Sequence, residues 1–496
     1  MKNRILHWTF CLIVQVTVYA HTFHVFFLAD DFDLLINPDF WLTLKHGFFR
    51  PVTILFIKTL YLLFGTNPLP YHLASFILHF LTGILLYFLV INITKNSYLA
   101  LMSQLLFGVH YLSSEAVFWI SSINSVLATF FCLFCILMYF KFRLTKKKAF
   151  LYLSLMGLCL ALLSKEIAVT TPIFIILTDM GISLHKAGTF KWRDTLKRTL
   201  PLLLVGLAYL VAKAYSISTA FNQHTLQIGY HAFRNLRHIV LSLFTFNTFN
   251  DLPLLKIDIA LLNLFKNPPI PSPVLKKTDL VHFYLPLLTG LLILALVVFL
   301  LVKGEKRTRL ALLACLIAGG PVIFFSVWHI PYGGYFQYPL RLYYLPAALF
   351  FIFLACFFQD LLKWGQKKIQ FNRIIISLVI LFSISIGISD FIKLKQRGMD
   401  WRQAGKLAHA LLIQLEPYLK QPPRDKTIVL LNLADNYNGA YIYRNGIQSA
   451  VKIFYPQSTA TIKVRKNPDL TELAPRLLTG EVIVLDCSEG KIKPMF

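Results

Sequence analysis

Charged residues are scarce in this 496-residue chain, and acidic residues are the scarcest of them. Only 15% of the residues are charged, whereas 56% are hydrophobic, and the mean hydropathy is +0.62. This composition excludes a water-soluble globular protein and indicates a polytopic α-helical membrane protein. The 49 Lys and Arg outnumber the 23 Asp and Glu, giving a formal net charge of +26. The basic residues lie in short gaps between apolar runs, as the positive-inside rule requires, which argues against a nucleic-acid partner.

Patterns for disulfides, metal sites and cleavable signals are also missing. Six of the seven cysteines lie inside apolar runs. The pair Cys132 and Cys135 has C-x-x-C spacing but no second ligand pair nearby, so we predict neither a disulfide framework nor a metal site. The first apolar run is too long for a signal peptide and lacks a small-residue cleavage site, which predicts a retained signal anchor.

The hydropathy pattern predicts about eleven transmembrane helices. A span needs about 20 apolar residues, and somewhat fewer where neighbouring helices bury its end. The predicted spans are 5–28, 70–93, 98–112, 117–140, 149–164, 167–184, 199–217, 281–302, 310–328, 342–362 and 374–392.

The charges of the loops predict the orientation of these spans. With the basic N-terminus in the cytoplasm, every internal gap carries Lys or Arg, and the opposite short gaps hold almost none beyond Lys165 and Arg341. Two further apolar segments, 51–65 and 233–249, contain basic residues. If either one crossed the membrane, the orientation of every later span would be inverted, which the loop charges oppose. We therefore expect both to be interfacial helices on the outer leaflet.

The chain divides into a membrane domain at 1–393 and a C-terminal part at 394–496. The C-terminal part has β-type runs at 427–433 and 481–487 and a polar, helix-compatible stretch at 400–419. These features predict a small extracytoplasmic α/β domain.

Carboxylates near lipid are costly unless they have a partner or a task. Asp30, Asp31 and Asp33 follow the first span directly, at the start of the first extracytoplasmic loop (29–69), which also contains Arg50. A helix stop at the interface would explain a single Asp. Three carboxylates within four residues favour a functional site.

Three further turns on the same predicted outer face carry ionisable side chains. A snorkelling or capping role explains any one of them alone, but their shared depth predicts one site. These residues are His110 and Glu115, Lys165 and Glu166, and His329 and Arg341.

Such a cluster suits the transfer of a sugar from a lipid phosphate. A carboxylate can remove the proton of an acceptor hydroxyl as it attacks a sugar carbon, while Lys and Arg neutralise the departing phosphate. Aromatic-rich spans can hold a polyprenyl chain.

At these residues the sequence resembles the GT-C superfamily of integral-membrane glycosyltransferases, which use polyprenyl-phosphate-linked sugars. ADDFDLLINP is similar to the acidic motif of their first extracytoplasmic loop, and FFRPVTILF to the Arg-Pro segment of the transmembrane and TPR repeat-containing O-mannosyltransferases. HYLSSEAVFWISSINSVLA, LLSKEIAVTTP and RLYYLPAALF resemble three more segments of that group. The sequence departs from the group at Tyr111, where Pro is usual, and at Ala347, where Ser is common, and no TPR array follows.

The resemblance implies that Asp30 or Asp31 is the catalytic base. Asp30 is favoured because a residue nearer the end of the span should be better fixed. Glu115 would contact the acceptor or the donor.

The resemblance further implies that Lys165 and Arg341 bind the lipid phosphate, with Glu166 and Arg50 orienting them. A satisfied core histidine is an equal alternative for His110. Supporting positions are expected for His110, Glu166 and His329.

The resemblance thus predicts a GT-C glycosyltransferase with its site at the outer face of a bacterial cytoplasmic membrane. Its partners would be a polyprenyl-phosphate-linked sugar, an acceptor protein, lipid or glycan, and membrane lipid. The sequence identifies no cofactor with certainty, and a divalent cation beside the acidic motif stays open. A transporter or lipid-linked sugar flippase is the main alternative, but it predicts charges at mid-bilayer and a repeat between halves. A polysaccharide polymerase or ligase is a second alternative, which usually depends on Arg and His in a large late loop.

Overall fold

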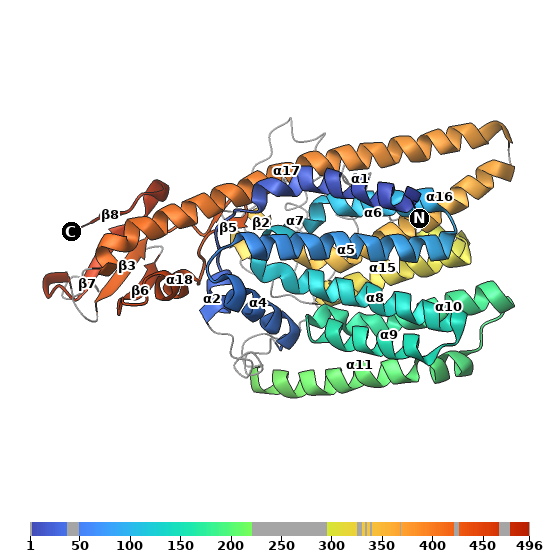
Figure 1. The fold of residues 1–496 in the computed structure, drawn as a ribbon, viewed down its shortest axis with the longest axis horizontal. Helices are drawn as coiled ribbons and strands as arrows, with labels where there is room; N and C mark the ends of the chain where they lie inside the picture. Colours follow the sequence, from blue (N-terminus) through green and yellow to red (C-terminus); the bar gives the residue numbers. More distant parts are fainter. Residues whose placement is uncertain are drawn as a thin grey trace, which may run out of the picture.

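A computed structural model of the chain shows a bundle of long helices with a small sheet at its C-terminal end (Figure 1). The structure describes residues 2–36, 49–220, 295–324, 330–332, 335–337, 340–367, 369–420, 426–465 and 477–495.

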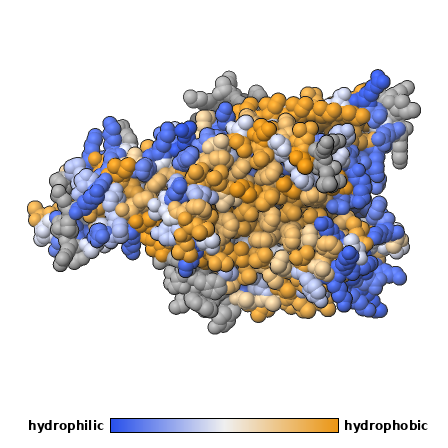
Figure 2. Space-filling model, viewed as in Figure 1, coloured by the Kyte–Doolittle hydropathy of each residue, from blue (hydrophilic) through white to orange (hydrophobic). Residues whose placement is uncertain are grey.

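Seven helices in the described part of the chain are long and apolar enough to cross a membrane. On the face shown in Figure 2, hydrophobic residues form a broad band across the bundle, with hydrophilic residues towards both ends. The chain is therefore a multi-pass membrane protein. The elements that supply these spans are α1 (Lys2–Tyr19), α5 (Leu69–Thr94), α8 (Ile123–Thr145), α10 (Thr171–Ala187), α11 (Trp192–Ala220), α16 (Tyr344–Lys367) and α17 (Ile369–Lys420).

Further helices of the bundle are α4 (Pro51–Phe64), α6 (Ser97–Val109), α9 (Lys148–Leu162) and α15 (Lys306–Phe324). At 13 and 15 residues, α6 and α9 are shorter than the spans predicted at 98–112 and 149–164. Most of 281–302 and all of 233–249 lie outside the described residues, so the count of eleven spans stays a prediction.

Local sequence sets several helix starts. The Asn96 side chain accepts hydrogen bonds from the backbone N–H groups of Tyr98 (3.0 Å) and Leu99 (3.2 Å), which caps α6. Proline occupies the first turn of α4 and of α10, where its missing N–H costs nothing.

Helix α17 differs most from the sequence prediction. The span predicted at 374–392 and the separate helix at 400–419 form one helix of 52 residues, about 78 Å long. Its C-terminal half packs closely on the chain that follows α1. A Cβ at Gly405 would lie 2.9 Å from Cγ1 of Val25, and a Cβ at Gly398 would clash with the His21 ring.

The end of the bundle with the N-terminus carries the loops between α8 and α9, α10 and α11, and α16 and α17 (Figure 1). At this end the buried Asp179 carboxylate on α10 pairs with Arg143 of α8 and with Arg198 of α11, the latter at 2.7 Å. This cluster ties three helices together beside the basic loops.

Short elements connect the helices at the opposite end. They are η1 (Ala20–Thr22), α2 (Asp31–Ile36), η2 (Tyr111–Ser113), α7 (Ser114–Phe118), η3 (Ile120–Ser122), η4 (Glu166–Thr170), η6 (Leu340–Tyr343) and the hairpin β1 (Ile330–Tyr332) and β2 (Tyr335–Gln337).

The C-terminal part forms a four-stranded sheet in the order β6-β3-β7-β8. The central β3 runs parallel to β6, with Thr427 opposite Thr461, and parallel to β7, with Thr427 opposite Val482. This region lies beside α2 and α7, at the end opposite the basic loops (Figure 1). Its elements are β3 (Thr427–Leu431), β4 (Asn436–Tyr437), β5 (Ala440–Tyr441), α18 (Ile447–Phe454), β6 (Thr461–Arg465), β7 (Val482–Asp486), η7 (Ser488–Gly490) and β8 (Lys493–Pro494).

Candidate functional site

Asp31 begins α2 and is almost completely buried, with 2% of its surface exposed. Its carboxylate accepts hydrogen bonds from the backbone N–H groups of Leu28 (2.9 Å) and Ser121 (2.7 Å), and from the Ser121 hydroxyl. Burial raises the pKa of Asp31 to about 7, and the hydrogen bonds from Ser121 and Leu28 oppose the rise. Asp31 therefore anchors the acidic loop to η3.

Asp30 is half-buried and makes no side-chain hydrogen bond to the described part of the chain. It lies within electrostatic range of Arg341. The sequence analysis favoured Asp30 as the better fixed of the two carboxylates. In the structure Asp31 is the fixed one. Within the described ranges, the side-chain oxygens of Asp30 accept no hydrogen bond.

Lys165 lies between α9 and η4 and is 4% exposed. Its Nζ donates to the Ser125 hydroxyl at 2.5 Å. Burial and the nearby Arg50 lower the pKa of Lys165 well below its usual value. Because Ser121 and Ser125 are one helical turn apart, Asp31 and Lys165 reach the same end of α8.

Arg50 and Glu166 form a two-point ion pair beside Lys165. The Arg50 Nε donates to Glu166 Oε2 at 3.0 Å, and Nη2 donates to Oε1 at 2.5 Å. The Thr53 hydroxyl on α4 donates to the Ser164 carbonyl at 3.0 Å. These bonds fix the start of α4 against the turn that carries Lys165.

Glu115 on α7 and Arg341 on η6 form a buried ion pair. The Glu115 carboxylate accepts from the Arg341 guanidinium and from its backbone N–H at 3.2 Å. The guanidinium lies 4.9 Å from the centroid of the Trp119 ring and donates to the Tyr441 hydroxyl at 3.5 Å. Arg341 is therefore held from three sides.

These groups occupy one region. Lys165 lies within electrostatic range of Arg50, Glu166, Arg341 and Glu115, and Asp30 links this group to the acidic loop. His329 lies outside the described residues. A free carboxylate beside buried cations can accept a proton and stabilise an anion.

His110 lies apart from this network. Its Nδ1 is 2.5 Å from Asp390 Oδ2 on α17, and no hydrogen bond joins it to another of the predicted site residues within the described ranges. Its Nε2 is buried without a hydrogen-bond partner in the same ranges.

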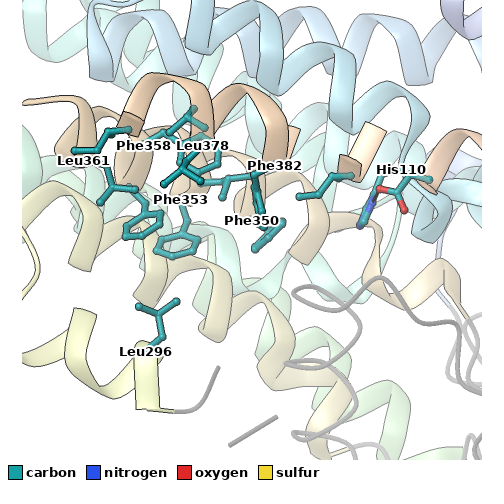
Figure 3. Close-up of a pocket in the computed structure, with 14 residues that line it drawn as sticks. His110, Leu296, Phe350, Phe353, Phe358, Leu361, Leu378 and Phe382 are labelled. Atoms are coloured by element: carbon teal, nitrogen blue, oxygen red, sulfur yellow. Dashed lines mark hydrogen bonds and ion pairs between the residues drawn. The ribbon is translucent and has the colours of Figure 1, made fainter. Parts of the chain in front are cut away.

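A cavity of about 390 Å³ extends from the His110–Asp390 pair between α16 and α17. Figure 3 shows a row of phenylalanine side chains with His110 at one end and Leu361 at the other. Ile375 and Asp390, both in its wall, are fifteen residues apart on α17, about 22 Å along the helix. Its lining is His110, Leu296, Phe350, Phe353, Leu354, Phe357, Phe358, Leu361, Ile375, Leu378, Val379, Phe382, Ile386 and Asp390.

Sequence reasoning missed three residues that hold the site, Ser121, Ser125 and Tyr441, and it missed Asp390, the partner of His110. The two serines lie in the segment that carries the resemblance, but serine in an apolar run gives no signal of its own. Asp390 was detectable as an acidic residue at the end of a predicted span.

No group of three or more His, Cys, Asp or Glu side chains in the described part of the chain could hold a metal ion. All seven cysteines are free thiols, and Cys132 and Cys135 contact the hydroxyls of Thr171 (2.9 Å) and Ser154 (3.3 Å).

The chain is similar in sequence to curated protein O-mannosyl-transferases, which confirms the resemblance seen in its motifs. It is 36% identical to protein O-mannosyl-transferase TMTC1 of Homo sapiens over 153 residues, covering 27% of this chain and 17% of that protein. It is 28% identical to protein O-mannosyl-transferase Tmtc1 of Drosophila melanogaster over 191 residues, covering 34% of this chain and 22% of that protein. The matched region thus spans about a fifth of these relatives. No family model matches the sequence.

Two solved structures resemble the chain at low identity. The oligosaccharyltransferase of Archaeoglobus fulgidus has a TM-score of 0.48 and 11% identity, covering 97% of this chain and 67% of that chain. ArnT from Cupriavidus metallidurans has a TM-score of 0.43 and 12% identity, covering 98% and 93%. Both TM-scores are too low to assign a role to any residue.

Proposed function

We propose that the chain is a GT-C type glycosyltransferase that moves a sugar from a polyprenyl-phosphate donor to an acceptor hydroxyl. The observation that carries this proposal is the Asp30 carboxylate, which has no hydrogen-bond partner in the described part of the chain and lies within electrostatic range of the buried Arg341. An isolated base beside cations suits proton removal coupled to the departure of a phosphate.

In the proposed reaction, Asp30 takes the proton of the acceptor hydroxyl. The acceptor oxygen then forms a bond to the anomeric carbon of the sugar. The bond from that carbon to the phosphate oxygen breaks, and the polyprenyl phosphate leaves with the electron pair. Lys165 and Arg341 balance the charge that develops on the phosphate.

The neighbouring residues hold these groups in place. Asp31 fixes the acidic loop through Ser121, and Glu115 orients the Arg341 guanidinium. Arg50 and Glu166 set the turn that carries Lys165.

The phenylalanine-lined cavity between α16 and α17 is the proposed site for the isoprenoid chain. It is apolar along the row of aromatic rings, and His110 precedes the proposed acceptor or donor contact, Glu115, by only five residues. A chain lying between α16 and α17 would bury its methyl groups against these rings.

The proposed site faces outward, because it lies at the end of the bundle opposite the basic loops (Figure 1). The proposed location is a bacterial cytoplasmic membrane, with the C-terminal sheet outside. Because the curated relatives are named O-mannosyl-transferases, mannose is the first sugar to test, with a serine- or threonine-containing peptide as acceptor.

The test uses the full chain purified into liposomes with radiolabelled polyprenyl-phosphate mannose and such a peptide. Labelled peptide supports the proposal. Movement of the labelled lipid between leaflets without transfer, for mannose and every other sugar offered, would replace it with the flippase alternative.

A further inference from the structure

The acidic loop is held in part by the C-terminal part of the chain. Ala29 has a φ of +48°, a left-handed conformation that residues with a side chain rarely adopt. Such a conformation persists only where the surroundings impose it. The Ala29 N–H donates to the Ile442 carbonyl at 2.7 Å, so a residue of the C-terminal part stabilises the strained turn.

Gly446 closes over the same turn. A Cβ at this position would lie 2.1 Å from the Ala29 carbonyl oxygen and 3.2 Å from the Phe32 ring. The φ of Gly446 is −81°, which any residue adopts, so its own backbone does not require glycine. Contact with the acidic loop is what requires it.

Two further contacts join the loop to the same C-terminal segment. The Ser449 hydroxyl donates to the Asp33 carboxylate. The Phe32 ring stacks on Tyr443, with centroids 5.6 Å apart and planes at 24°. Ala29 before Asp30, and Phe32 and Asp33 after it, are thus held by the C-terminal part.

The cationic side of the site reaches the same segment. Tyr441 contacts the Arg341 guanidinium through its hydroxyl, and its ring centroid lies 4.8 Å from that of Trp119. The Trp119 indole N–H in turn donates to the Leu28 carbonyl at 3.2 Å. One short segment therefore contacts both the carboxylate loop and the guanidinium.

We infer that residues 441–449 of the C-terminal part, with Tyr441 and Gly446 as its positioning residues, set the distance between Asp30 and Arg341. This inference rests on the proposed function for its catalytic consequence. Its structural content, that the segment holds the acidic loop, is independent of any reaction. Since a misplacement of about 1 Å can cost about 100-fold in rate, a small shift of the loop should be visible in turnover.

Gly446→Ala tests the inference, because the alanine backbone fits this position and only the added methyl group meets the loop. The matched control is Gly181→Ala on α10, where the methyl group would meet Leu310 alone among the described residues, at an ordinary 3.4 Å. Hydrogen exchange by mass spectrometry is measured on the peptide 26–33, and transfer kinetics are measured on the same proteins.

For Gly446→Ala we expect exchange in 26–33 to be at least about tenfold faster, kcat to fall about 10- to 100-fold, and KM for the donor to stay within about threefold. The control should match the wild type. Unchanged exchange in the variant would overturn the inference. If the wild type transfers sugar, faster exchange in the variant with an unchanged kcat would also overturn it. Faster exchange with no transfer by the wild type would sink the proposed function and leave the loop contact standing.

Should Gly446→Ala fail to fold, Tyr441→Phe with Ser449→Ala provides the test without added volume. This variant removes only two hydroxyl groups, and we expect faster exchange in 26–33 with a kcat lowered about 3- to 30-fold. Wild-type exchange and kcat in this variant would overturn the inference.

Discussion

Replacing Arg341 by glutamine should destabilise the protein by about 3–5 kcal/mol, because it leaves a buried carboxylate without its cation. In the structure the Arg341 and Glu115 side chains are only 10% and 6% exposed. Without the guanidinium, Glu115 keeps the backbone N–H of residue 341 as its remaining donor from η6.

The size of the coupling follows from the burial of the pair. Two opposite charges about 4 Å apart attract by about 4 kcal/mol at an effective dielectric constant of about 20. Glu115→Gln and Arg341→Gln should each be costly, but the double variant removes both charges. It should therefore recover about 2–3 kcal/mol relative to the sum of the single costs.

The assay is reversible unfolding in mixed detergent micelles, carried out on the wild type, both single variants and the double variant. The matched control is the exposed pair of Lys420 and Glu416 on α17, whose side chains are 66% and 34% exposed. Its coupling should be far smaller than that of the buried pair, because solvent screens exposed charges. Additive costs at Glu115 and Arg341, or a coupling no larger than in the control, would refute the structural role of the pair.

Three further predictions concern Lys165, Asp31 and the cavity. Because the pKa of Lys165 is lowered before a phosphate binds, donor binding should take up a proton, and donor affinity should weaken as the pH rises. Lys165→Gln should bind the donor weakly at every pH. An equal pH dependence of donor affinity in that variant would contradict this prediction. Because burial raises the pKa of Asp31 from 3.8 to about 7, the folded state binds the proton more tightly than the unfolded state does. Thermal stability in detergent should therefore fall as the pH rises from about 4 to about 7. Asp31→Asn should flatten that slope, and an unchanged slope in the variant would contradict the prediction. Phe353→Ala should raise KM about tenfold for long-chain polyprenyl donors and leave the KM for a short-chain donor unchanged. Equal effects on KM for both donors would refute the cavity as the site of the isoprenoid chain.

The positions of the long helices could be predicted because an apolar run of about 20 residues has few other uses. The single helix α17 could not. Two acidic residues, Asp390 and Asp400, lie near or beyond the end of the predicted span, and in the fold each has a partner. His110 lies 2.5 Å from Asp390, and the Asn438 amide lies 3.1 Å from Asp400. Those partners are remote in the sequence, so the hydropathy pattern around α17 cannot predict them.

The charged residues of the candidate site could be found because each is expensive near lipid. The hydroxyl groups that position them could not, since Ser121 and Ser125 look like ordinary helix residues. Tyr441 is 100 residues from Arg341 along the chain, and only the fold brings them together. The roles of Asp30 and Asp31 also needed the structure, because adjacent carboxylates are indistinguishable in sequence and differ only in the donors that reach them.

The most direct test compares Asp30→Asn with Asp31→Asn in sugar transfer from a polyprenyl-phosphate donor, with donor binding measured on the same membranes. Asparagine keeps the shape of the side chain and removes the proton acceptor. We expect Asp30→Asn to bind donor normally and to lose about 10²- to 10⁴-fold in transfer, and Asp31→Asn to lose less, because it acts by loosening the loop. Transfer by Asp30→Asn at the wild-type rate would contradict the account.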